Sequence, residues 1–122
     1  MVESALATIM QTSLGLVQGT NLFAGILPRE HAEGVVITVN KEFAESGSLT
    51  KCLMTILALY KNYTSARNMA DSVAQLLLAK EGTLDGTLGT APPVTTNYYG
   101  KDDQDRHMFS VSCLVTYTSD KV

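Results

Sequence analysis

Residues 107–118 largely alternate between apolar and polar side chains, and this alternation constrains the fold more than any other feature. Every second position is large and apolar: Phe109, Val111, Cys113, Val115 and Tyr117. The positions between them are mostly hydroxyl-bearing: Ser110, Ser112, Thr116 and Thr118, with Leu114 among them. Successive side chains of a strand point to opposite faces of a sheet. The segment therefore predicts a strand of an antiparallel sheet, with one face on the core and one in water.

Two segments have the apolar spacing of amphipathic helices. Residues 2–14 form the first, and Gly15 follows as a C-terminal cap. Residues 64–80 form the second, with Thr64 or Ser65 as the expected N-terminal cap. Its stripe consists of Ala66, Met69, Ala70, Val73, Ala74 and Leu77. Leu76 and Leu78 lie off this stripe, which indicates an additional contact.

The remaining chain predicts further strands and the connections between them. Strands are expected at 34–40, 51–60 and 94–99, after a short apolar run at 22–24. Residues 41–50 are expected to be a loop, 82–93 an irregular connector and 100–106 a hairpin turn. With 122 residues the chain suits one domain, 1–122. The predicted fold class is α+β, a mostly antiparallel sheet with two main helices packed on one face.

Residues 51–60 are apolar on both alternating sets of positions, which a sheet covered on one face does not require. A second layer or another chain would cover the second set, and a short buried helix is the alternative reading of this run. We therefore predict a subunit interface that includes Leu53, Leu57, Leu59, Leu76 and Leu78.

Catalytic patterns are missing from the sequence. It has two histidines and contains no G-x-S-x-G, phosphate-cradling glycine loop or C-x-x-C, so we expect no enzymatic activity and no cofactor. Asp102, Asp103, Asp105 and His107 are the nearest approach to a metal site, yet the glycine and glutamate of a calcium loop are missing. A solvated hairpin tip is the favoured interpretation. A small cytosolic binding module with a weak surface ion site remains the alternative.

Charge and cysteine content limit the partners. Nine basic residues are scattered singly among twelve acidic ones, which disfavours specific nucleic-acid binding. No apolar run approaches the roughly 20 residues of a membrane span. Cys52 and Cys113 lie in apolar runs, as buried thiols do, and with no signal peptide a reducing cytosol is expected.

Three stretches, taken in order, resemble a known family. They are GLVQGTNLFAGILPRE at 15–30, LALYKNYTSARNMADSVAQLL at 57–77 and YYGKDDQDRHMFSVSCLVTY at 98–117. Together they resemble the minor capsid and tail-terminator (tail-completion) proteins of tailed bacteriophages. The chain departs from the family where relatives often carry a glycine before the arginine of the last turn, because Asp105 stands there.

The resemblance implies a tail-terminator-like fold and a virion structural protein at the head–tail junction, present in the host cytoplasm before assembly. It implies a ring, commonly of six copies, that caps the tail tube. The implied partners are other copies of the chain, the major tail tube protein and the head-completion or connector protein. A head-completion or connector protein on the capsid side is the alternative. Expected partner-contact residues in the loops are Phe43, Glu45, Ser46, Gly47, Asp102, Asp103 and Arg106.

Overall fold

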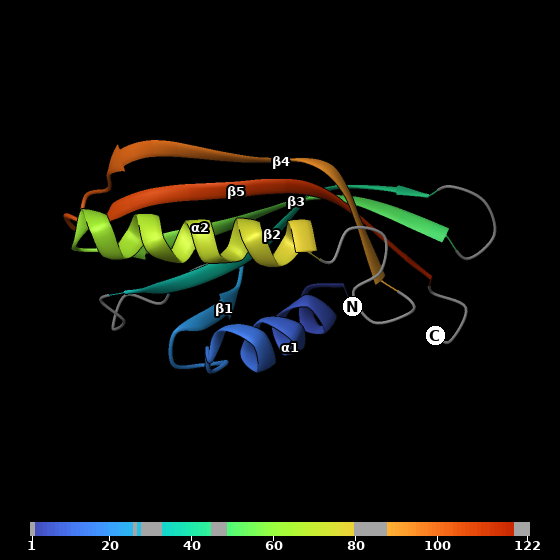
Figure 1. Cartoon of the computed structure of the whole chain (residues 1–122), viewed down its shortest axis with the longest axis horizontal. Helices are drawn as coiled ribbons and strands as arrows, with labels where there is room; N and C mark the ends of the chain where they lie inside the picture. The colour runs from blue at the N-terminus through green and yellow to red at the C-terminus, as the bar shows by residue number, and fades with distance from the viewer. Residues whose placement is uncertain (1, 26, 28–32, 45–48, 80–87, 119–122) are drawn as a thin grey trace.

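A computed structural model describes residues 2–25, 27, 33–44, 49–79 and 88–118. It contains two helices and five strands (Figure 1). In chain order they are α1 (Val2–Leu14), β1 (Leu22–Ala24), β2 (Gly34–Ala44), β3 (Leu49–Tyr60), α2 (Tyr63–Ala79), β4 (Leu88–Lys101) and β5 (His107–Thr118).

The five strands form one mixed sheet in the order β1-β2-β3-β5-β4. β1 pairs with β2 in parallel, whereas β2–β3, β3–β5 and β5–β4 are antiparallel. β3 is the central strand and is paired on both sides over nearly its whole length. The predicted α+β class is confirmed, and the one parallel pair makes the sheet mixed.

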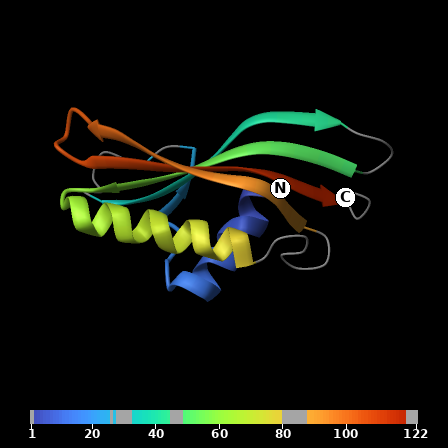
Figure 2. The same cartoon turned by 45° about the horizontal axis from the view of Figure 1, so that its top comes forward.

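Both helices lie on the same face of the sheet (Figures 1 and 2). The main core lies between them and the sheet, as the periodicity of the helices predicts. Helix side chains contribute Leu6, Met10, Ala66, Ala70, Val73 and Leu77. Strand side chains contribute Leu22, Val35, Ile37, Cys52, Met54, Ile56, Ala58, Phe109, Val111, Cys113 and Val115. Burial of this apolar surface is the main force that holds the two layers together.

The prediction of a loop at 41–50 is wrong for most of that segment. β2 runs to Ala44 and β3 begins at Leu49, and Phe43 pairs with Lys51. β3 is held along this stretch by β5 on its other side, where Lys51 pairs with Thr116. Pairing satisfies backbone groups whatever the side chains are, so a polar segment can extend a hairpin. The predicted contact residues Glu45, Ser46 and Gly47 lie outside the described residues.

The connector predicted at 82–93 is also wrong in its second half, because β4 begins at Leu88. Proline cannot donate to a ladder, and it is tolerated at the edge of a sheet, where one side of the strand needs no partner. β4 is such an edge strand, and its register with β5 shifts by two between Ala91 and Thr95. Pro92 and Pro93 lie within that shift. Residues 82–87 are outside the described ranges.

The helix ends show one confirmed signal and one correction. Gly15 follows α1 with φ 71° and donates its N–H to the Gln11 carbonyl, as expected of a C-terminal cap. The cap of α2 is Asn62, whose side-chain oxygen accepts a hydrogen bond from Ser65 N at 3.1 Å. The prediction of Thr64 or Ser65 as cap placed the helix start too late, since α2 begins at Tyr63.

Candidate functional site

The face of the sheet opposite the helices carries the candidate site, and we call it the open face (Figure 2). On β3 it receives Leu53, Thr55, Leu57 and Leu59, which alternate with side chains buried beneath the helices. This strand is therefore apolar on both faces, and no described helix covers the second one.

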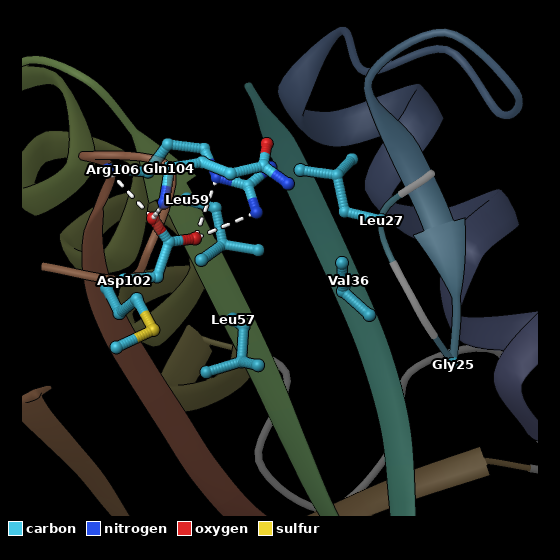
Figure 3. A pocket seen from close by; sticks show the side chains of 9 residues that line it. Gly25, Leu27, Val36, Leu57, Leu59, Asp102, Gln104 and Arg106 are labelled. Atoms are coloured by element: carbon cyan, nitrogen blue, oxygen red, sulfur yellow. Dashed lines mark hydrogen bonds and ion pairs between the residues drawn. The ribbon is translucent and has the colours of Figure 1, made fainter. Parts of the chain in front are cut away.

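One end of the open face is closed by the chain itself. Leu27, Val36 and Leu59 are buried there in a small second cluster, and Phe23, Leu57 and Met108 pack against it. A groove of about 320 Å³ lies over these residues, Phe23 excepted, and is also bordered by Gly25, Asp102, Gln104 and Arg106. Figure 3 shows Leu27 and Val36 on one side of the groove and Leu57 and Leu59 on the other, with Arg106 and Gln104 above them.

An ion pair in the β4–β5 turn forms the polar wall of this groove. Asp102 Oδ2 lies 2.8 Å from both Nε and Nη2 of Arg106, so the guanidinium donates twice to one carboxylate oxygen. The other oxygen accepts from Arg106 N at 2.9 Å and Gln104 N at 3.0 Å. Only 8% of the Arg106 side chain and 14% of the Asp102 side chain are exposed. The pair is thus an internal support of the turn.

These hydrogen bonds determine the protonation of Asp102. Burial by itself would raise the pKa of the carboxyl. The N–H groups of Arg106 and Gln104 and the guanidinium charge outweigh burial and hold the pKa below its usual range. Asp102 is therefore a carboxylate at neutral pH, with both oxygens already engaged.

A row of hydroxyl groups crosses the open face beyond the groove. Thr38, Thr55, Ser112 and Thr95 are register partners on β2, β3, β5 and β4. Thr55 Oγ1 donates to Asn40 Oδ1 at 2.5 Å and lies 3.3 Å from Ser112 Oγ. The row separates the groove from a second apolar pair, Leu53 and Leu114, which are partners on β3 and β5.

The structure divides the predicted interface residues between the two sides of the sheet. Leu53 is 41% exposed on the open face, Leu57 is half-buried and Leu59 is buried in the second cluster. On α2, Leu76 is half-buried against the main core and Leu78 is 49% exposed. The five leucines therefore do not form one surface, and Leu53 and Leu78 are the two most accessible members.

The acidic turn likewise separates into different environments. Asp102 and Arg106 pair with each other, whereas Asp103 is exposed. Asp105 lies 3.2 Å from Lys101 and has φ 64°, the one positive φ of a non-glycine residue in the described ranges. The described residues contain no group of three or more His, Cys, Asp or Glu side chains that could hold a metal ion.

An aromatic cluster at the start of α2 was not found from the sequence. Tyr63 makes edge contacts with Tyr98, His107 and Phe109 at ring distances of 5.3–5.5 Å. The Tyr98 hydroxyl lies 2.7 Å from His107 Nδ1. These residues come from α2, β4 and β5, so spacing along one segment gives no signal for the cluster. It anchors the start of the helix to β4 and β5.

Comparison of the chain with protein-family models and with curated proteins finds no match. No helix in the described ranges is long and apolar enough to cross a membrane.

Proposed function

We propose that the chain is a virion structural protein of a tailed bacteriophage, a tail terminator that forms a ring and caps the tail tube. The observation that carries the proposal is the open face of the sheet. It presents the groove at one end and Leu53 with Leu114 at the other, with no described helix over either. Such a surface suits burial against another protein chain.

The interactions of the acidic residue Asp102 also agree with an assembly role. The one closely paired acidic residue on this surface, Asp102, is neutralised by Arg106 and supports the turn. The open face therefore offers apolar side chains and hydroxyl groups, which suit binding to another protein better than catalysis. A closed ring buries such surfaces head to tail between identical neighbours.

Asp105 is the position where the chain departs from the family's pattern, and its backbone conformation bears on that departure. Its φ of 64° is a conformation that glycine adopts without steric cost. Relatives in the tail-terminator family often have glycine before the arginine of this turn. Asp is one of the few other residues that tolerate the left-handed region, because its short side chain can hydrogen-bond locally. The departure in sequence is therefore compatible with the same turn.

The experiment combines light scattering with electron microscopy of the purified chain, with and without isolated tail tubes. We expect a ring, six-fold in the simplest case, that binds tube ends and stops further addition of tube subunits. Leu53→Lys is expected to prevent ring formation, since a charge would then be desolvated at the contact. Gln75→Lys, on the exposed side of α2, is the matched control and should leave the ring intact.

A chain that never exceeds two copies and never binds tube ends would overturn the proposal. If rings form and bind the head connector in preference to the tube, the protein acts on the capsid side. A pull-down against the two purified partners distinguishes these roles.

A further inference from the structure

The two edges of the sheet are protected to different degrees against pairing with another chain. At one edge, β1 has three residues, and β2 beyond Ile37 has a register shift between Val39 and Lys41. Short edge strands and irregular register are devices by which proteins block edge-to-edge association.

The opposite edge is β4, which pairs only with β5 in the described part of the chain and lies at the rim in Figure 1. Its first half contains Pro92 and Pro93, which cannot donate to a new ladder. Its second half, Val94–Tyr99, contains no proline, glycine or charge. Side chains from Thr95 to Tyr99 are exposed, and Tyr99 is the most exposed of the large hydrophobic side chains in the described ranges, at 62%.

We propose that two copies of the chain pair antiparallel along Val94–Tyr99 of β4, about a two-fold axis at Asn97, and so form one continuous sheet. A two-fold axis perpendicular to the sheet reverses the strand direction and keeps both pairs of helices on the same side. Directly opposite residues then share a face, so their numbers must have the same parity. Centring on Asn97 meets this condition.

The register about Asn97 brings complementary side chains together. Thr96 lies opposite Tyr98 on the helix face, and Thr95 lies opposite Tyr99 on the open face, each twice by symmetry. Pairs of an aromatic with a β-branched residue are favourable across antiparallel strands. Centring on Thr96 instead would place Pro93 opposite Tyr99 and lose these pairs. The segment is therefore most complementary to itself about Asn97.

This two-fold pair goes beyond the proposed ring and does not depend on it. A two-fold contact is satisfied by two copies, whereas a cyclic ring needs a head-to-tail contact. The pair uses the edge of the sheet and the ring uses its open face. A ring without the pair, or a pair without the ring, would separate the two proposals.

Disulfide trapping tests the register directly. Facing Cα atoms in an antiparallel pair are about 4.5–5.5 Å apart, within the range of a disulfide. Asn97→Cys should therefore form a covalent dimer under mild oxidation. Thr95→Cys alone is the matched control on the same face and should not, because it faces Tyr99 of the second copy. A mixture of Thr95→Cys and Tyr99→Cys should cross-link.

The native thiols do not interfere with this experiment. Cys52 and Cys113 are buried at 0% and 2% exposure. Burial raises the pKa of the Cys113 thiol to about 11, so little of its reactive thiolate exists at neutral pH.

Asn97→Lys tests the pair without cross-linking, because it places two like charges opposite each other. By light scattering the wild type should have twice the mass of the variant, whose subunit is 13.1 kDa, with unchanged circular dichroism. Equal masses for the wild type and the variant at every concentration would overturn the proposal. Equal cross-linking of Asn97→Cys and Thr95→Cys alone would overturn it as well.

Discussion

The two faces of β3 have similar apolar content but differ in how far their side chains are buried. On the helix face, Met54 and Ile56 are at most 1% exposed beneath α1 and α2. On the open face, Leu59 is buried by Leu27 and its neighbours, whereas Leu53 is 41% exposed. Along β3, the described residues thus bury the helix face and only one end of the open face. Apolar residues alone do not distinguish a core from a contact surface, and the difference lies in what lies above them.

The largest expected effect comes from truncating one side chain on each face. Met54→Ala should lower the free energy of unfolding by about 3 kcal/mol, through lost apolar transfer and the cavity left behind. Leu53→Ala should lower it by only about 0.5 kcal/mol, since the side chain already contacts water. Urea denaturation at low protein concentration measures both. Equal losses would mean that another part of the chain covers Leu53.

The next effect concerns the closed end of the open face. Asp102→Asn leaves the buried Arg106 guanidinium without its counter-charge and should cost about 2 kcal/mol at pH 7. Asp103→Asn, one residue away and exposed, is the control and should change the unfolding free energy by less than about 0.5 kcal/mol. A cost as small for Asp102 as for Asp103 would show that the turn does not depend on the ion pair.

The difference in unfolding free energy between the wild type and Asp102→Asn should depend on pH, with a defined sign. The pKa of Asp102 is lower in the folded chain than the ordinary value of about 3.9. Its contribution is therefore fully present above that value and is lost as the pH falls through the lower folded pKa. The stability difference between wild type and Asp102→Asn should be constant from pH 7 to about pH 5 and shrink below about pH 4.

The smallest expected effect concerns the backbone conformation of Asp105 in the β4–β5 turn. Asp105→Gly should raise the free energy of unfolding by up to about 1 kcal/mol, because φ 64° costs an L-residue more than it costs glycine. Loss of the exposed pair with Lys101 subtracts little, since such surface pairs contribute at most about 1 kcal/mol. Asp105→Asn removes the charge and keeps the side chain. If Asn and Gly stabilise equally, the charge and not φ is the cause.

Elements with strong periodicity could be predicted from the sequence to within a residue or so. α1, the short β1 and β5 agree with the predicted 2–14, 22–24 and 107–118. The errors fall where pairing overrides side-chain preference. Residues 41–44, which include Lys41 and Glu42, and the proline-containing start of β4 are strands because β3 and β5 offer them backbone partners.

The candidate site was only partly predictable for the same reason. The two-sided character of β3 is visible in the sequence, so Leu53 and Leu57 were found there. The Asp102–Arg106 pair was not, although both residues were singled out as partner contacts, because spacing does not reveal that the two side chains meet. The cluster around Tyr63 joins three elements and has no local signal at all.

The sequence by itself determined the fold class, the buried face of each helix and the excess of apolar residues on β3, since these depend on periodicities of 3.6 and 2. Only the tertiary structure decided which part of that excess stays exposed and which edge of the sheet stays unprotected. Those outcomes depend on long-range packing: Leu27 reaches the groove at one end of the open face, and the strand order leaves β4 outermost.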